Sequence, residues 1–531
     1  MICDKTCLKD LVLSEIIRTF AKKLIMSKDI GEDSYSHILK YTGIFGGVQG
    51  LNILISLVRN KAVALLLGPS GMGLASLFQT TVNFISQTTN LGISFSAVRN
   101  VSELFDHGDE VSVYHFIKVV RVWSMLTGLV GMLLCIAIGP MLSNLTFSWG
   151  NHTLHFVLLS PLVFLLAVTG GETAILKGAR QLKSLAVIQV YSVIAALIIT
   201  LPLYYLFGQT GIVPVMVLMG LTTLLLTIHR SYRLYPLHFT GAKGILGEGM
   251  GMVRLGVAFT LAGIIGSGAE MVIRSYLNVT GDLEVLGLYN VGYMLTITYA
   301  GMVFSAMESD YYPRLSAVNN DVETTNLTVN RQMEVSLLII SPMLTALIVF
   351  LPILIPLMFS SEFIDVVTMA QVSVLAMFFK VLTLPVAYIT LARGKSVIYL
   401  ILETSYFVVF VMLVIFGYEQ WGLWGTGLAI TIAHVFDYFL INGYAYKKYG
   451  YRMSVTVVRY AVVLVLLGLL AYASTFLSDS PLRWVSGVVL TVASTCFSIH
   501  VLRQKTHLWE TLTRRFRRNQ KRKSSSTSTR L

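Results

Sequence analysis

The chain has 531 residues, of which 55% are hydrophobic and 13% charged, and its formal net charge is +13. Soluble domains carry about 25% charged residues, so this composition excludes an ordinary soluble protein. A mean hydropathy of +0.72 indicates an integral membrane protein instead.

Residues 1–37 are rich in Lys and Arg, and we expect them to form a cytoplasmic N-terminal segment. Within it, apolar residues recur on one stripe of a helix: Leu13, Ile16, Ile17, Phe20 and Leu24. Such a stripe is typical of an amphipathic helix at the membrane surface, although a plain cytoplasmic extension explains the segment equally well. No short apolar segment with a cleavage site opens the chain, so we expect no removed signal peptide.

From residue 41 onward, apolar stretches of about 20 residues, the length that crosses the hydrocarbon core as a helix, follow one another closely. They predict fourteen membrane-spanning helices: 41–67, 73–98, 114–138, 154–176, 184–207, 211–229, 250–277, 285–311, 333–358, 366–392, 397–417, 422–446, 454–476 and 484–502. The loops between them are too short for a soluble catalytic domain. We therefore expect the function to be carried out within the membrane.

Lys and Arg gather in alternate loops, whereas the intervening loops are neutral or acidic. By the positive-inside rule both termini are cytoplasmic, which agrees with an even number of spans. The tail 504–531 contains "RRFRRNQKRKSSSTSTR". It predicts a disordered basic segment held against anionic lipid headgroups, rather than a nucleic-acid-binding element.

Short signatures recur at a nearly constant offset along the chain. Gly73-Leu74 matches Gly287-Leu288, Lys177-Gly178 matches Arg393-Gly394, and Gly211 matches Gly422. Together they predict a duplicated six-span unit. The expected fold is an all-α polytopic membrane protein with two pseudo-symmetric six-helix bundles, 38–235 and 246–446, followed by an extra helical hairpin at 454–503. A binding site is expected between the bundles near the membrane midplane.

Polar residues form stripes along several spans. In the first span, Asn52 and Arg59 share one helical face with Gln49 and Ser56. The second span repeats the pattern with Gln79, Asn83 and Asn90. Unpaired donors in lipid cost several kcal/mol each, so these faces border protein or water.

Charged residues deep in a membrane are expensive and are candidates for functional sites. We predict that Arg59 faces a hydrated central cavity, where it holds an anionic group together with Arg274 or Lys380. The alternatives are a helix-to-helix contact for Arg59 and a local ion pair with Glu270 for Arg274. Lys61 lies about 200° further around the helix, so its stem is able to extend to the membrane surface instead.

Acidic residues within the spans suggest a second role. Glu270, Glu403 and Asp437, with His434, are candidates for binding a coupling Na⁺ or H⁺, and pairing with the buried cations is the alternative. Glu308 and Asp310 are candidates for an inner gate with Arg314 or Arg331. Scattered cysteines give no metal-ligand spacing, so we expect no metal, no other cofactor and no catalytic residues.

The segments "NKAVALLLGPSGMGLASLFQ", "GLYNVGY", "DYYPRLS" and "TLARGKS" resemble the Wzx-type O-antigen or polysaccharide-repeat flippases of the MOP (multidrug, oligosaccharidyl-lipid, polysaccharide exporter) superfamily, over about residues 40–446. The resemblance implies a flippase in the bacterial inner membrane. It would move undecaprenyl-diphosphate-linked oligosaccharides from the cytoplasmic to the periplasmic leaflet by alternating access, beside the polysaccharide polymerase machinery. The family pattern places its basic residue at Lys61, seven residues before Gly68, rather than at Arg59. Fourteen spans exceed the twelve usual in Wzx proteins and match the lipid II flippase branch.

Two other functions remain open at this stage. A cation-coupled drug or metabolite antiporter on the same scaffold would favour an acidic central cavity. A membrane polysaccharide polymerase or glycosyltransferase would carry a sizeable external loop, and all external loops here are short.

Overall fold

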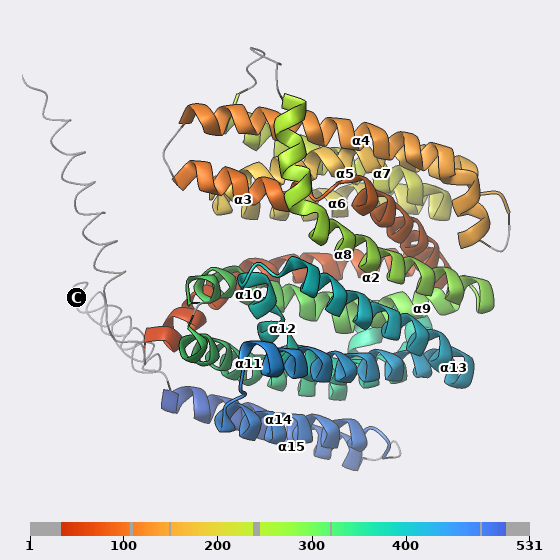
Figure 1. Cartoon of the computed structure of the whole chain (residues 1–531). Coiled ribbons are helices and arrows are strands. Elements are labelled where there is room, and N and C mark those ends of the chain that lie inside the picture. Colours follow the sequence, from red (N-terminus) through yellow and green to blue (C-terminus); the bar gives the residue numbers. More distant parts are fainter. Residues whose placement is uncertain are drawn as a thin grey trace, which may run out of the picture.

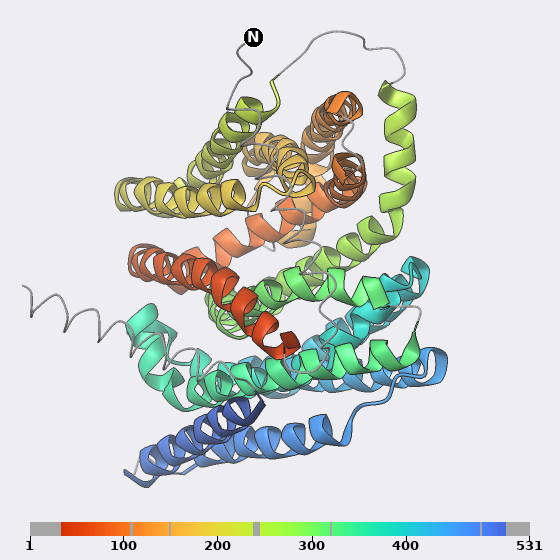
Figure 2. The same cartoon turned by 90° about the vertical axis from the view of Figure 1, so that its left-hand side faces the viewer.

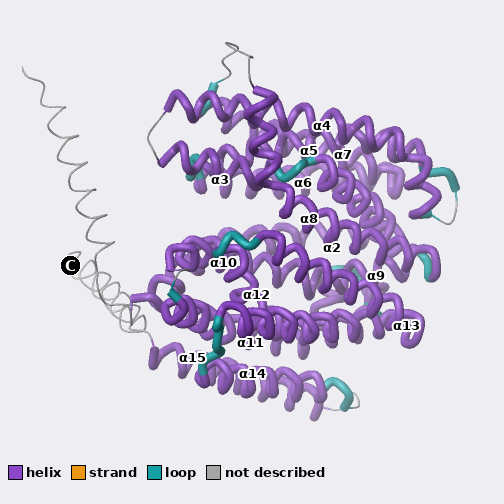
Figure 3. The backbone as a smooth tube through the Cα atoms, viewed as in Figure 1, coloured by secondary structure: helices purple, strands orange, loops and turns teal. Residues whose placement is uncertain are grey.

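A computed structural model describes residues 33–106, 110–147, 150–236, 245–318, 321–477 and 481–505. Every regular element within these ranges is a helix (Figure 3). The predicted amphipathic helix and the basic tail from residue 506 lie outside the described residues.

The helices follow the chain in two groups and a hairpin. The first group, the N-lobe, consists of α2 (Asp33–Thr89), α3 (Ile93–Asp106), α4 (Glu110–Thr146), α5 (Thr153–Gly178), α6 (Leu182–Phe207), the short η1 (Gly208–Gly211) and α7 (Ile212–Leu234). The second, the C-lobe, consists of α8 (Ile245–Thr280), α9 (Leu283–Tyr293), the π-helix η2 (Met294–Thr298), α10 (Tyr299–Val318), α11 (Val322–Met358), η3 (Ser361–Phe363), α12 (Val366–Ala392) and α13 (Ser396–Tyr449). The hairpin is α14 (Val455–Ser474) and α15 (Pro481–Lys505).

Figure 1 shows the two lobes as stacked layers, with the hairpin on the far side of the C-lobe. Both hairpin helices pack against α11. Gly468 of α14 lies against Phe378, and Gly487 of α15 lies against Val349. The predicted architecture of two bundles and an added hairpin is therefore confirmed.

Nine helical stretches of the described residues are long and apolar enough to cross a membrane. Three of them, within α2, α6–α7 and α13, contain a break and provide two crossings each. The more polar α8 and the α9–α10 pair complete the fourteen predicted crossings.

The three breaks have a common backbone cause. Gly68 has φ 64°, Gly208 has φ 55° and Gly422 has φ 58°, a left-handed region that glycine enters at little cost. Without its break, the 57 residues of α2 would extend about 85 Å at 1.5 Å per residue, well beyond the hydrocarbon core. We call the end of the molecule with these breaks the Gly68 end, and the opposite end the Arg230 end.

In the structure, a single constant offset relates corresponding residues of the two repeats. Gly208 and Gly422 occupy the same break, at the offset that also relates Gly73 to Gly287, so Gly422 corresponds to Gly208 rather than to Gly211. The turn between α5 and α6 places Arg180 at φ 57°, and the turn between α12 and α13 places Gly394 at φ 67°, again at this offset. Matching hydrogen bonds, Gln181 N to Leu176 O and Lys395 N to Thr390 O, support this register.

The first predicted pair, Gly73 and Gly287, joins the two lobes at the Gly68 end. A Cβ at position 73 would lie 2.2 Å from the carbonyl oxygen of Leu283, and one at position 287 would lie 2.0 Å from that of Pro69. Leu283 lies four residues before Gly287, and Pro69 lies four residues before Gly73. The contact is therefore itself pseudo-symmetric. Only glycine permits α2 and α9 to approach this closely.

The N-lobe also contains a buried ion pair. Arg121 of α4 donates to Glu172 of α5 at 2.8 Å, and the two side chains are 6% and 1% exposed. Ser231 of α7 donates to the same carboxylate, and the ring of Tyr232 lies 4.1 Å from the guanidinium carbon. The pair thus ties together three helices of the lobe.

At the Arg230 end, α8 connects the lobes. Figure 2 shows that α8 is bent, so that its first turns run in a different direction from the rest of the helix. These turns pack against α3 and α4 of the N-lobe, where Gly249 lies directly on the indole of Trp123.

Candidate functional site

A cavity of about 430 Å³ lies between the lobes. Four N-lobe helices, α2, α5, α6 and α7, form most of its wall, and α8, α9 and η2 of the C-lobe close it. Its polar lining comprises Arg59, Asn60, Ser76, Gln79, Thr80, Asn83, Thr169, Thr200, Tyr204, Thr223, Glu270, Arg274 and Asn290.

Arg59 lines this cavity from the first part of α2. Its Nη2 donates to Asn60 Oδ1 at 3.3 Å. The amide nitrogen of Asn60 in turn donates to the hydroxyl of Tyr299 at 2.8 Å and approaches the sulfur of Met294. No carboxylate of the described residues forms an ion pair with Arg59. Its charge is therefore available to a ligand.

The contact from Asn60 reaches the C-lobe at an irregular point of the chain. Met294 and Tyr299 lie at the start of η2 and directly after it. π-Helical turns are rare and are frequent at functional sites. Here the turn brings a sulfur and a hydroxyl to the amide that orients Arg59.

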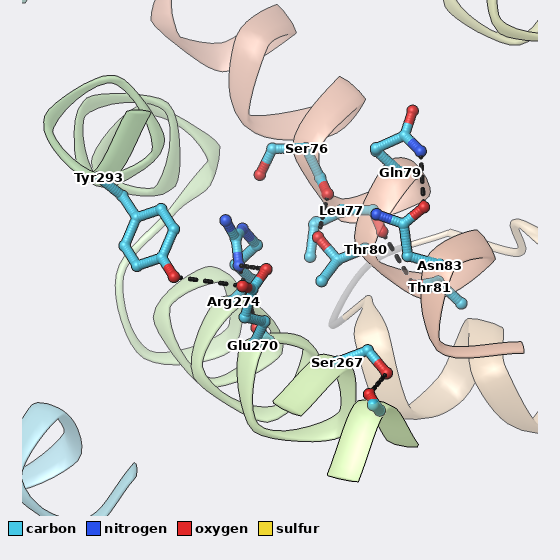
Figure 4. Close-up of polar contacts among 11 residues, drawn as sticks. Ser76, Leu77, Gln79, Thr80, Thr81, Asn83, Ser267, Glu270, Arg274 and Tyr293 are labelled. Atoms are coloured by element: carbon cyan, nitrogen blue, oxygen red, sulfur yellow. Dashed lines mark hydrogen bonds and ion pairs between the residues drawn. The ribbon is translucent and has the colours of Figure 1, made fainter. Parts of the chain in front are cut away.

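Arg274 also lines the cavity, but its charge has a partner. Its Nη1 donates to Glu270 at 3.0 Å, as the local alternative predicted. Tyr293 donates to the other oxygen of the same carboxylate at 3.2 Å. Figure 4 shows this group on the C-lobe side, facing the α2 segment with Ser76 and Thr80. With Arg59, Arg274 and Glu270 as its charged residues, the cavity lining has a formal charge of +1.

Amide and hydroxyl groups surround these charges. Gln79 donates to Asn83 at 2.9 Å along the second part of α2, so the predicted stripe faces the cavity at both residues. Thr169, Thr200 and Thr223 line the opposite wall. Such groups form hydrogen bonds with neutral hydroxyls without adding charge.

The remaining predicted binding residues lie elsewhere. Lys61 donates to the carbonyl oxygen of Pro356 at 2.7 Å, one of the last carbonyls of α11, where a cation is favoured by the helix dipole. Asn90, in the turn before α3, donates to Ser94 in the first turn of α3. Asn52 is buried and lies outside the cavity lining.

Lys380 occupies a separate cavity of about 50 Å³ within the C-lobe, together with Glu403 and Asp437. Its ammonium lies 5.9 Å from the ring centre of Tyr406. His434, also buried, contacts the same ring, and its Nδ1 is 2.9 Å from the carbonyl oxygen of Ile430. The structure therefore brings Arg59 and Arg274 together and separates Lys380 from them.

The candidate gate is only partly described. Arg314 donates to Gln332 at 3.2 Å. The side chains of Glu308 and Asp310 lie outside the described residues, so their pairing stays a prediction.

Sequence reasoning missed several cavity residues. The cavity residues Asn60 and Asn290 were not selected, nor were the threonines of α5, α6 and α7. Tyr299, which accepts a hydrogen bond from Asn60, was not selected either. Asn60 had a readable signal, because "RNK" at residues 59–61 places three polar residues in succession inside an apolar span. The threonines had none, since a lone threonine usually bonds to its own helix, as Thr169 does with Leu165.

The fold is shared with solved membrane transporters. A multidrug resistance MATE family transporter of the MOP superfamily, in an inward-facing conformation, is 16% identical with a TM-score of 0.61, and the match covers 76% of this chain and 94% of that one. A MOP superfamily transporter from Pyrococcus furiosus is 14% identical with a TM-score of 0.59, over 79% and 96%. The lipid II flippase MurJ, in an inward closed conformation, is 16% identical with a TM-score of 0.58, over 87% and 99%.

These likenesses confirm the predicted MOP fold. No curated protein sequence matches the chain significantly. The family model described as "Polysaccharide biosynthesis protein" matches residues 62–368. That match covers more than half of the chain. This multi-pass membrane protein therefore belongs to the family of polysaccharide biosynthesis proteins.

Proposed function

We propose that the protein is a flippase that moves an undecaprenyl-diphosphate-linked oligosaccharide from the cytoplasmic to the periplasmic leaflet of the bacterial inner membrane. The observation that carries this proposal is the position of Arg59. It lies in an interlobe cavity, without a carboxylate partner among the described residues, amid amides and hydroxyls.

The charge of the lining supports an anionic headgroup. An unpaired guanidinium away from bulk water is costly unless an anion offsets it, and guanidinium binds phosphate oxygens in a bidentate fashion. Arg59 holds the diphosphate in this proposal, and Arg274 adds a second donor when Glu270 is displaced. A volume of about 430 Å³ lies within the usual range of about 300–1,000 Å³ for small-ligand sites. It accommodates the diphosphate and the first sugars, while the polyprenyl tail stays in lipid.

Movement between leaflets requires each end of the interlobe space to open in turn. The glycine contact of α2 with α9 and the Lys61–Pro356 bond join the lobes at the Gly68 end. In the proposed orientation, with both termini cytoplasmic, this is the periplasmic end. Separating these contacts releases the headgroup there. No covalent chemistry is needed, so the proposed protein is not an enzyme.

The fold alone fits a drug antiporter equally well. A site for cationic drugs would favour a negative lining, however, and the lining here is formally +1. The carboxylates Glu403 and Asp437 instead occupy the C-lobe cavity, where we place the coupling of transport to H⁺ or Na⁺.

The test is complementation of a deletion in the native host, with lipid-linked glycans measured on each membrane face. Arg59→Ala is expected to leave the glycan on the inner leaflet, and Arg59→Lys to restore part of the transport. Arg99→Ala, which removes an exposed arginine of α3, is the matched control. Normal transport by Arg59→Ala at wild-type membrane levels would contradict the proposal.

A further inference from the structure

A second concave surface lies on the N-lobe between the early turns of α6 and the late turns of α7. This α6–α7 groove encloses about 220 Å³. Its basic residues are His229, Arg230 and Arg233, and Ile188 and Leu226 contribute apolar walls. The volume lies below the range of about 300–1,000 Å³ typical of sites for drug-sized ligands, so the groove suits a small headgroup rather than a glycan.

Within the part of the chain that the structure describes, the basic side chains of the groove have no acidic partner. No Asp or Glu lines it, and none of the described carboxylates forms an ion pair with His229, Arg230 or Arg233. Arg230 and Arg233 are three residues apart on one helix, a spacing at which like charges repel. An anion between them removes this repulsion.

An apolar surface extends from the groove along α6 and α7, in the direction away from the basic residues. On α6, Ile194 and Ile198 follow Tyr191 on the same helical face and are 37% and 66% exposed. On α7, Leu218, Leu221 and Leu225 precede His229 on one helical face and are 41%, 39% and 58% exposed. Residues at these spacings form a stripe, and an exposed apolar stripe on a membrane-spanning helix faces lipid chains. The groove therefore ends in two such stripes, one on each helix.

The groove faces away from the interlobe cavity on α6. Thr200 and Tyr204 of this helix line that cavity, whereas Tyr191 lines the groove. Tyr191 precedes Thr200 by nine residues, which is half a turn around the helix at 100° per residue. On α7 the groove continues along the face that lines the cavity, because Leu226 and Arg230 follow Met219 and Thr223 by seven residues each. A ligand in the groove thus lies nearer the Arg230 end than the cavity does and on the opposite face of α6.

We propose that the α6–α7 groove binds an anionic glycerophospholipid. Its phosphate lies between Arg230 and Arg233, whose guanidinium groups match phosphate geometry, and its two acyl chains follow the two apolar stripes. Arg233 belongs to the last turn of α7, the level at which headgroups meet basic side chains. A lipid carrier with a single polyprenyl chain would leave one stripe uncovered. The bound lipid joins α6 to α7 and stabilises the N-lobe.

The experiment is native mass spectrometry of the full chain in detergent with dioleoyl phosphatidylglycerol, dioleoyl phosphatidylcholine or undecaprenyl phosphate. Phosphatidylglycerol is expected to bind more tightly than phosphatidylcholine. The double variant R230Q/R233Q is expected to weaken phosphatidylglycerol binding by about tenfold or more, because two charge-assisted contacts are lost. The matched control is R452Q/R459Q, which removes two exposed arginines near the start of α14 and is expected to bind as wild type does.

Three outcomes overturn the proposal. The first is unchanged phosphatidylglycerol binding by R230Q/R233Q. The second is a selective loss of undecaprenyl phosphate, which would make the groove a dock for the carrier. The third is displacement of phosphatidylglycerol by millimolar inorganic phosphate, which would make it a phosphate site.

A reporter keeps the test decisive even when the double variant fails to fold. Tyr191→Trp places an indole at the groove in an otherwise unchanged chain. Because the wild-type chain has six tryptophans of its own, the measured quantity is the quenching of Tyr191→Trp beyond that of wild type. Brominated phosphatidylglycerol is expected to give more of this additional quenching than brominated phosphatidylcholine does. Equal quenching by the two lipids contradicts the proposal.

Discussion

The two lobes carry cavities at corresponding positions but of very different size, about 430 Å³ at the N-lobe and 50 Å³ inside the C-lobe. The constant offset of the repeat allows their linings to be compared directly. Leu166, Thr169 and Thr223 line the larger cavity, and their counterparts in the second repeat, Lys380, Thr383 and Asp437, line the smaller one.

The difference shows how a duplicated backbone acquires two roles. Neutral and mostly small side chains leave space on the N-lobe wall, where Gly220 stands at the position of His434. In the C-lobe, Lys380 and Asp437 place opposite charges in the same space. The N-lobe therefore takes its cation from α2, as Arg59, and keeps room for a ligand. Side-chain volume and charge, rather than backbone geometry, separate the proposed binding lobe from the proposed coupling lobe.

The largest effect is expected where a buried charge loses its partner. Glu172→Ala leaves Arg121 buried and uncompensated, which costs about 3–5 kcal/mol. Glu270→Ala is expected to cost less, because Glu270 is 35% exposed and Arg274, although its own side chain is only 7% exposed, lines a cavity that loss of the carboxylate enlarges. The free energy of unfolding, or the yield of folded protein, in detergent compares the two variants. Equal losses would show that the N-lobe pair is no more essential than the pair at the cavity.

The next effect concerns the contact that joins the lobes. Gly73→Val and Gly287→Val place side-chain atoms on the carbonyls of Leu283 and Pro69. Overpacking costs about 1–3 kcal/mol, so the closed Gly68 end is disfavoured by about five- to 150-fold. Because the contact is pseudo-symmetric, both variants are expected to behave alike.

Accessibility of a cysteine at Ser76, which lines the cavity, measures opening at the Gly68 end. Gly443→Val is the control, since no atom lies within 4 Å of its Cβ position. A change in only one of the two glycine variants contradicts the symmetric contact.

The sequence predicts the fold well because the membrane imposes simple rules. Apolar length marks each crossing. The repeated glycines mark positions that the backbone needs, and Gly73 and Gly287 proved to be direct partners. The other two pairings were slightly displaced, because Arg180 and Gly208, rather than Gly178 and Gly211, hold the left-handed positions.

The sites were harder to predict because they depend on rotation and depth rather than on composition. Lys61 and Arg59 are two residues apart, yet one meets the end of α11 and the other the cavity. Lys380 has the residue type and depth of a headgroup ligand but belongs to the interior of one lobe. Asn60 gains its role only from the π-helical turn that places Met294 and Tyr299 beside it.

A smaller effect is expected from the C-lobe cavity. Asp437→Asn keeps the shape of the side chain and removes its charge, so substrate binding in the larger cavity is expected to remain. The dependence of transport on pH or Na⁺ is expected to fall by the order of tenfold, a usual size for coupling between sites. This is tested by measuring transport at several pH values and Na⁺ concentrations. Thr223→Val, a substitution at the corresponding position of the N-lobe cavity, serves as the matched control. Retained ion dependence in Asp437→Asn places the coupling elsewhere.

The smallest effect concerns the caps of two C-lobe helices. Asp282 and Asp321 cap α9 and α11, whereas the N-cap residues of α5, α6, α7, α12 and α13 make no side-chain capping bond. Hydrogen bonds from the hydroxyl and amide of Thr324 lower the pKa of the exposed Asp321. A lowered folded-state pKa contributes stability above the ordinary value of about 3.9, and this contribution disappears as the pH falls through the folded-state pKa.

Asp321→Ala is therefore expected to lower the thermal unfolding temperature slightly at neutral pH, because the cap is lost. The difference from wild type begins to shrink below about pH 4, where the carboxyl of the unfolded chain takes up a proton, and is smallest once the pH has fallen through the lowered folded-state pKa. Asp321→Asn separates the cap from the charge, because asparagine caps equally well but does not titrate. Its stability is expected to follow wild type at neutral pH and to lack the acid-dependent component. If Asp321→Asn is as unstable as Asp321→Ala at pH 7, the carboxylate charge rather than the capping bond stabilises the start of α11.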